Sequence, residues 1–306
     1  MKQSILAGAM LALSSLAPVF SASADPAPAN FETGALQVEQ LGSKGPALIF
    51  IPGLASGSWT WRDSAERLGK SHAVYLVTLP GFDGRKPAPG VNFETLMADL
   101  RSLIETRRLD RPVLVGHSLG GTLSMAFAAE HSELIAGVIA VDGLPVFPGT
   151  EGVTGDRSAL AQQARAQLAG QTPAQFAAYQ QTYMGRMGVI DATVATRLAE
   201  WSGRSDPGAT AEFAAQLLML DLRPKLPSIH VPVVEISPFY APDFAAMGVD
   251  ENAKTNYYRM LLRGVAKLEV VSVSPARHFV MFDQPEKFAA ALDGALSKVV
   301  ELGASK

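Results

Sequence analysis

The sequence predicts an α/β fold in which a doubly wound, mostly parallel sheet carries an inserted helical cap. Short β-rich runs alternate with helical stretches along most of the 306 residues. These runs are apolar throughout, which suits strands of a parallel sheet that helices cover on both faces. One long interval without a strand interrupts the alternation, which is expected where a helical unit is inserted into such a sheet.

Six segments have the composition of buried strands. The first two end at Pro52-Gly53 and Pro80-Gly81, dipeptides that favour turns. The segments comprise residues 47–51, 73–79, 112–116, 135–143, 231–237 and 266–273.

Helices are expected between these strands. In 92–109 the apolar residues recur at the spacing of one helical face, and Asn92 is placed to cap it. Thr95 stands three residues after Asn92 where a capping box would have Glu, so no capping box is expected. The stretch 119–130 reads as a second helix, and 284–300 as a final amphipathic helix with Pro285 near its start.

The interval 150–222 is predicted to be a helical cap. It is rich in Ala and Gln, and its helical segments lie near 157–169, 173–185, 191–201 and 209–221. The α/β core would then comprise 25–149 and 223–306.

The first 24 residues are predicted to be a signal peptide. Lys2 precedes a short apolar run, and Ala22-Ser23-Ala24 fits the small-residue rule for cleavage before Asp25. We therefore expect export to the periplasm or the medium without a stable membrane anchor. The Pro/Ala-rich stretch 25–34 is expected to be a loose leader.

Composition narrows the function classes. The chain contains no cysteine, which excludes disulfides and thiolate metal ligands. Its formal charge is −3, and acidic and basic residues are mixed without a Lys/Arg cluster, which argues against a nucleic-acid partner. We expect a small-molecule substrate, no cofactor and no metal, while the oligomeric state stays open.

The segment "VLVGHSLGGTLSMAF" holds the strongest local motif, G-x-S-x-G centred on Ser118. It follows a predicted strand and opens a predicted helix, the setting in which a nucleophile occupies a sharp turn. Gly116 and Gly120 remove the Cβ clashes that such a turn would create. The alternative is a glycine-rich helix start that serves only close packing.

His278 is the predicted general base. Of the five histidines, only His278 follows a strand at the carboxyl edge of the sheet, where sites of open α/β sheets lie. His117 adjoins the serine, and the side chains of neighbours in a sharp turn are expected to diverge.

Two aspartates could orient His278 while preserving the order Ser, Asp, His. Asp142 ends the strand after the nucleophile helix, whereas Asp243 lies six residues beyond the strand 231–237. Each also has a structural interpretation, Asp142 as a partner of loop amides and Asp243 as a helix cap.

The predicted oxyanion hole consists of two backbone N–H groups. One comes from Leu119, the residue after the nucleophile, and the other from Leu54 in the loop after the strand 47–51.

Taken together, "FIPGLASGSWTW", "LPGFDGR", "GHSLGG" and "ARHFVMFDQPEKF" resemble the α/β-hydrolase superfamily over roughly residues 45–300. The resemblance implies Ser118 as nucleophile, His278 as base, and Leu54 and Leu119 as oxyanion donors. Pro52-Gly53 replaces the family's usual His-Gly, and Ala241 stands where the acid is expected. Because some members take the acid from the preceding strand end, Asp142 is favoured over Asp243.

The function that these residues predict is an exported serine hydrolase that cleaves an ester, thioester or lactone through an acyl-enzyme. The alternatives are an amidase or aminopeptidase-like hydrolase and a non-catalytic ligand-binding protein. Epoxide hydrolases and haloalkane dehalogenases use an aspartate nucleophile, so Ser118 argues against both. Glu235 interrupts an apolar strand, and the sequence names no partner for its carboxylate.

Overall fold

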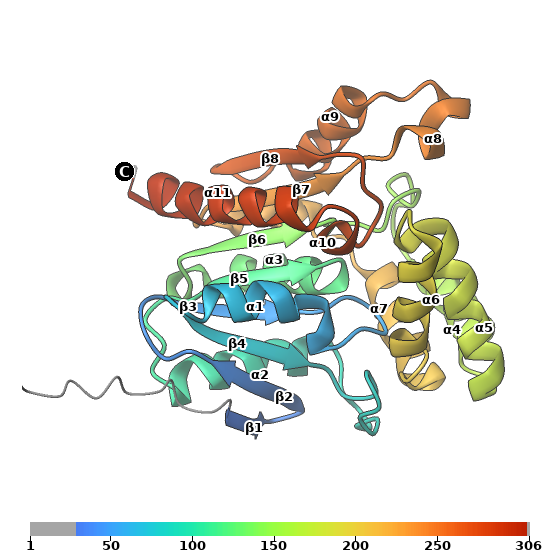
Figure 1. Ribbon diagram of the computed structural model, residues 1–306, viewed down its shortest axis with the longest axis horizontal. Helices are drawn as coiled ribbons and strands as arrows, with labels where there is room; N and C mark the ends of the chain where they lie inside the picture. The colour runs from blue at the N-terminus through green and yellow to red at the C-terminus, as the bar shows by residue number, and fades with distance from the viewer. Residues whose placement is uncertain (1–28, 305–306) are drawn as a thin grey trace, which may run out of the picture.

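A computed structural model describes residues 29–304 and contains one eight-stranded sheet (Figure 1). The strand order is β1-β2-β4-β3-β5-β6-β7-β8. Strand β2 pairs antiparallel with both β1 and β4, and β3 to β8 run parallel to one another. The strands are β1 (Ala29–Thr33), β2 (Leu36–Leu41), β3 (Ala47–Ile51), β4 (Ala73–Thr78), β5 (Val113–His117), β6 (Gly137–Val141), β7 (Val233–Pro238) and β8 (Leu268–Val273). The predicted fold class is confirmed.

Eleven α-helices lie in this described part of the chain. They are α1 (Arg62–Leu68), α2 (Phe93–Thr106), α3 (Leu119–His131), α4 (Ser158–Leu168), α5 (Pro173–Tyr183), α6 (Ala192–Ser202), α7 (Pro207–Met219), α8 (Ala241–Phe244), α9 (Glu251–Leu262), α10 (Val280–Asp283) and α11 (Pro285–Ala304). Shorter helical turns are η1 (Ser58–Trp61), η2 (Ser132–Leu134), η3 (Met184–Gly188), η4 (Arg223–Ser228) and η5 (Ala245–Met247).

Alternate residues of each central strand pack on opposite faces of the sheet. On β3, Ile49 and Ile51 belong to a core with α2 and α3, while Leu48 and Phe50 belong to a core with α1 and α11. Because both faces are covered, the strand is apolar at every position, which explains the unbroken run in the sequence.

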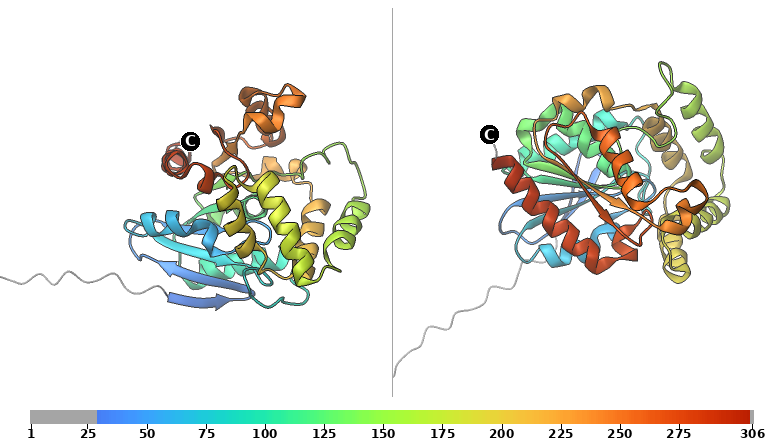
Figure 2. Two further views of the ribbon diagram at one scale, coloured as in Figure 1. Left: turned by 45° about the vertical axis from the view of Figure 1, so that its right-hand side comes forward. Right: turned by 90° about the horizontal axis from the view of Figure 1, so that it is seen from above.

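Helices α4 to α7 leave the core between β6 and β7 and gather beside the ends toward which β5 and β6 point (Figures 1 and 2). They fall within the interval 150–222 that the sequence assigns to a cap. Helix α4 packs on α7 and α5 on α6, so the four helices form two pairs.

Two expectations about local structure are wrong. Residues 29–33, expected in a loose leader, form β1. This strand pairs with β2 so that Ala29 lies opposite Gln40 and Thr33 lies opposite Leu36. Helix α2 does begin with a capping box, because the Thr95 hydroxyl accepts from the Asn92 N–H at 2.9 Å while the Asn92 side chain accepts from the Thr95 N–H. A threonine hydroxyl accepts as well as the Glu carboxylate that the motif usually supplies.

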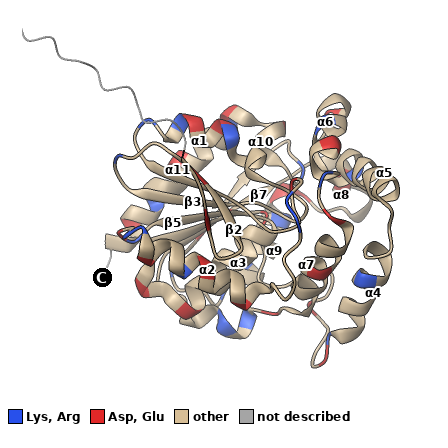
Figure 3. Cartoon of the chain, turned by 90° about the horizontal axis from the view of Figure 1, so that it is seen from below, with Lys and Arg blue, Asp and Glu red and all other residues tan. Residues whose placement is uncertain are grey.

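Charged residues of both signs are interspersed over the ribbon (Figure 3). Among residues 29–304, no helix combines the length and the apolar character needed to cross a bilayer. The predicted signal peptide, residues 1–24, lies outside the described residues.

Candidate active site

Ser118 sits in a sharp turn between β5 and α3. Its φ of +52° lies in the left-handed region, which a non-glycine residue rarely adopts. The turn is held by a hydrogen bond from the Ser118 N–H to the Val141 carbonyl at 2.9 Å. A Cβ on Gly116 would lie 2.2 Å from the Gly120 carbonyl oxygen, and one on Gly120 would lie 2.3 Å from that of Ile51. Both glycines are therefore required for the backbone to fold this closely around Ser118.

His278 and Asp142 lie together although 136 residues separate them in the chain. The Nδ1 atom of His278 is 2.5 Å from Oδ2 of Asp142, and the hydroxyl of Tyr258 donates to Oδ1 of the same carboxylate. Both carboxylate oxygens thus have a donor. The arrangement leaves the Nε2 atom of His278 as the ring nitrogen that can exchange a proton.

Asp243, the alternative acid, lies elsewhere. Its two carboxylate oxygens accept from the guanidinium of Arg277 at 2.7 and 2.8 Å, and the pair is partly exposed. Arg277 also donates to the carbonyls of Gly185 and Val189. Arg277 thus joins Asp243, on α8, to the backbone around η3.

His117 lies beside His278. Its ring lies 4.4 Å from that of His278, centroid to centroid, and its Nε2 atom is 3.0 Å from the His278 carbonyl oxygen. Burial, together with the neighbouring His278, lowers the pKa of His117 to about 3, so the ring is neutral at pH 7. A neutral ring that donates from Nε2 to a carbonyl supports the backbone of the loop that carries His278.

Glu235 lies beneath the turn that carries Asp142. The side chain is fully buried on β7, and its Oε1 atom accepts from the Gly143 N–H at 3.3 Å. Burial and the nearby charge of Asp142 raise the pKa of Glu235 well above its usual value. The neutral acid is thus the favoured form of Glu235, and the partner that the sequence did not supply is a backbone amide.

The charge of Lys254, on the first turn of α9, acts on Asp142 through space. Burial raises the pKa of Asp142, but Lys254, His278 and Tyr258 together outweigh burial and hold it well below the usual range. Asp142 is therefore ionised at neutral pH.

Leu119 and Leu54 are the two expected oxyanion donors. Leu119 is the first residue of α3, where N–H groups have no acceptor within the helix. Leu54 follows β3 and borders the same cavity as Ser118. Gly53, just before Leu54, approaches so closely that a Cβ there would lie 2.7 Å from Nδ1 of His117.

Ser118, Asp142 and His278 open onto one cavity of about 950 Å³. Its wall combines residues of the α/β core with residues of the helices α4, α5 and α7, and most of them are apolar. They include Leu144, Val146, Ala164, Leu168, Ala214, Leu217 and Leu218. Such a cavity suits an organic substrate with a large apolar part.

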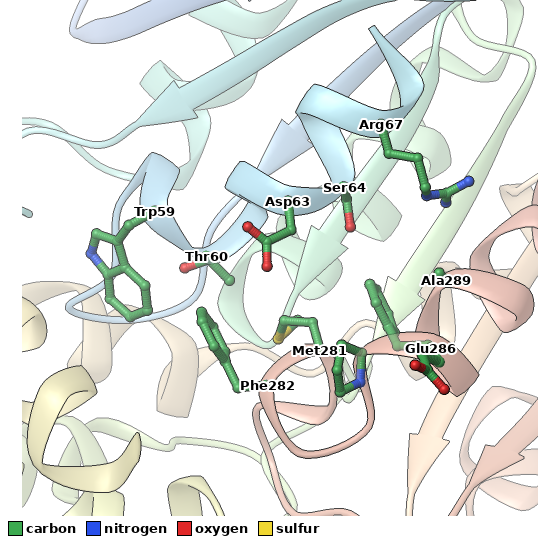
Figure 4. A pocket seen from close by; sticks show the side chains of 11 residues that line it. Trp59, Thr60, Asp63, Ser64, Arg67, Met281, Phe282, Glu286 and Ala289 are labelled. Carbon is green, nitrogen blue, oxygen red and sulfur yellow. The ribbon is translucent and has the colours of Figure 1, made fainter. Parts of the chain in front are cut away.

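A second pocket of about 240 Å³ lies between α1 and the start of α11 (Figure 4). It is bordered by Trp59, Arg67 and Phe282 among others and shares no lining residue with the large cavity. Neither Trp59 nor Trp61 lines the large cavity, because Trp59 packs on Trp201 and the fully buried Trp61 packs on Phe50. Within residues 29–304, no group of three or more His, Asp or Glu is arranged to hold a metal ion.

Sequence reasoning missed Tyr258, Lys254 and the supporting position of His117. Tyr258 and Lys254 belong to α9, whose relation to the site depends on how that helix packs across the edge of the sheet. A local motif carries no such information. His117 could have been noticed, because a histidine buried beside a nucleophile needs a hydrogen-bond partner.

Residues 48–291 match the model of a protein family described as the alpha/beta hydrolase family. The N-formylmaleamate deformylase of Pseudomonas putida is 32% identical over 110 residues, which is 35% of this chain and 41% of that protein. Three other curated relatives match over 28% to 40% of their own lengths. The chain therefore spans less than half the length of these relatives.

Two solved structures share the fold. The enol-lactonase from Burkholderia xenovorans LB400 has a TM-score of 0.70 at 20% identity, covering 88% of this chain and 100% of that one. A thermophilic esterase from Thermogutta terrifontis has a TM-score of 0.71 at 20% identity, covering 90% and 99%.

Proposed function

Because the chain belongs to the alpha/beta hydrolase family, we propose that it is a serine hydrolase cleaving a carboxylic ester, thioester or lactone. One observation carries the proposal. The hydrogen-bonded pair His278–Asp142 opens onto the same large cavity as Ser118 in its strained turn.

In the proposed reaction, His278 Nε2 takes the proton of Ser118 as its Oγ attacks the carbonyl carbon. Asp142 keeps the other imidazole proton on Nδ1 and stabilises the imidazolium that forms. The N–H groups of Leu54 and Leu119 receive the developing oxyanion, an interaction worth about 3–4 kcal/mol for each donor.

His278 then gives its proton to the leaving oxygen, or to the thiolate sulfur of a thioester, and the acyl group remains on Ser118. Water, deprotonated at Nε2 by the same imidazole, attacks the acyl carbon and releases the carboxylic acid. The ester class is supported by the apolar cavity and by the names of two structures with this fold, an enol-lactonase and an esterase.

Amide cleavage is the second candidate, favoured by one observation. The relative from Pseudomonas putida is named a deformylase of N-formylmaleamate, which is an amide. The two candidates differ in the leaving group that His278 must protonate.

The test combines a covalent probe with a substrate panel. A fluorophosphonate should label the wild-type protein on Ser118 and fail to label Ser118→Ala. Short-chain nitrophenyl esters should be hydrolysed and the matched nitroanilides left intact. Labelling of neither protein would reject both enzymatic functions and favour a ligand-binding protein, and faster anilide cleavage would favour the amidase.

We further propose that residues 150–222 act as a cap over the site and that the chain is exported. The proposal of export rests on the predicted signal peptide, residues 1–24, whose removal can be measured. N-terminal sequencing of the protein recovered from the periplasm or medium should begin at Asp25, whereas a retained Met1 would contradict export by cleavage.

A further inference from the structure

One lysine side chain lines the large cavity. Among the described residues that line it, Lys254 is the only Lys or Arg. The remaining wall is mostly apolar, so this cation stands out as a point of recognition for a ligand.

The position of Lys254 is fixed by three contacts. Its Nζ atom donates to the carbonyl of Pro238, the last residue of β7, and lies over the rings of Phe244 and Tyr258 at 5.4 and 5.1 Å. These contacts hold the ammonium at the carboxyl edge of the sheet, where ligands of such folds bind.

Lys254 has no directly bound anion. None of the ion pairs within 4.0 Å among residues 29–304 includes it, whereas the surface residue Lys225 pairs with Glu130 at 2.9 Å. Asp142 influences Lys254 through space, but the two oxygens of Asp142 already accept from His278 and Tyr258. An ammonium has three N–H donors, and Pro238 accepts only one.

We propose that Lys254 binds a carboxylate carried by the substrate, so that the preferred ester has an apolar body and one anionic end. This inference rests on the proposed function and names its substrate class. The apolar wall formed by residues such as Leu168 and Leu217 would take the body, while Lys254 would supply a charge-assisted hydrogen bond to the anionic end.

The test compares two series of esters with equal chain length. The first consists of 4-nitrophenyl monoesters of adipic, pimelic and suberic acids, and the second has the free carboxylate capped as a methyl ester. These chains exceed the short diacid monoesters whose own carboxylate attacks the ester. The wild-type protein should favour the free acid in kcat/KM by roughly tenfold or more for at least one chain length.

Lys254→Met keeps an unbranched apolar chain over Phe244 and Tyr258 and removes the charge. This variant should reduce the selectivity for the free acid by roughly tenfold to hundredfold. Lys225→Met, which removes a cation from the surface, is the matched control and should keep the wild-type ratio.

Two results would overturn the inference. In one, the wild-type protein shows no preference for any free acid. In the other, Lys254→Met lowers both series equally, which would place Lys254 in support of Asp142 alone. Should Lys254→Met fail to fold, the wild-type protein decides the question: suberate should inhibit it and the uncharged suberic diamide should not, and equal inhibition by both would overturn the inference. Failure of the proposed function is distinct, because then neither series is hydrolysed in a Ser118-dependent manner.

Discussion

Replacing Asp142 by Asn tests the arrangement around His278 in detail. The Tyr258 hydroxyl donates to Oδ1 of Asp142, so the amide oxygen of an asparagine should stay opposite that donor. Its NH2 group would then face Nδ1 of His278, which lies 2.5 Å from Oδ2 in the native protein. Because two donors cannot share that contact, the imidazole proton would move to Nε2.

A proton on Nε2 prevents His278 from accepting the proton of Ser118. The loss in kcat should therefore approach the cost of a wrong tautomer, about 10⁴-fold, or about 5.5 kcal/mol at about 1.4 kcal/mol per factor of ten. The assay is hydrolysis of a short-chain nitrophenyl ester under saturating conditions, with folding checked by circular dichroism.

Asp243→Asn is the matched control. It weakens only the partly exposed pair with Arg277, so the expected loss is about fivefold at most. Adding Tyr258→Phe to Asp142→Asn should recover part of the activity, because the amide is then free to turn its oxygen toward Nδ1. Retention of a tenth or more of the activity in Asp142→Asn, or an equal loss in Asp243→Asn, would refute the reasoning.

Three further changes probe the surroundings of the site. Gly120→Ala places a Cβ 2.3 Å from the Ile51 carbonyl oxygen and should lower the free energy of unfolding by about 1–3 kcal/mol. Gly294→Ala, at a helical position with open space around it, should raise the free energy of unfolding by about 0.5–1 kcal/mol. Denaturant titration measures both changes, and equal effects would contradict the packing argument. The stability that Glu235 contributes as a neutral acid is fully present below its unfolded pKa and is lost as pH rises through its raised folded pKa, so Glu235→Gln should become more stable than the wild type with rising pH. Unfolding titrations at several pH values measure the difference in free energy of unfolding between the two proteins, and a difference that shrinks from pH 4 to pH 7 would show that Glu235 is ionised. His117→Phe removes the hydrogen bond to the His278 carbonyl and should lower kcat about fivefold with little change in KM, and an unchanged kcat would show that this bond does not position the loop.

That Ser118, His278 and Asp142 lie near one another could be predicted from the geometry of a parallel sheet. The carboxyl ends of parallel strands converge at one edge of a sheet, so residues that follow three strands can be expected together without knowledge of side-chain contacts. The choice between Asp142 and Asp243 depended on a resemblance, because both preserve the required order along the chain.

The remainder depended on contacts that leave no local pattern. β1 and the outer part of β2 are half-exposed, so residues 29–41 lack the continuous apolar run that marks the central strands. Lys254 and Tyr258 reach the cavity because α9 packs on β8, the edge strand beside β7. Burial of His117 and Glu235 sets their protonation, and burial emerges only from the assembled sheet.

The most direct measurement is the mass of the enzyme during turnover. The wild-type protein, mixed with a nitrophenyl ester and quenched in acid within milliseconds to seconds, should gain the mass of one acyl group, and peptide mapping should place that group on Ser118. Ser118→Ala should gain none. Turnover of the ester without any acyl adduct, or with an adduct on a residue other than Ser118, would contradict the proposed acyl-enzyme.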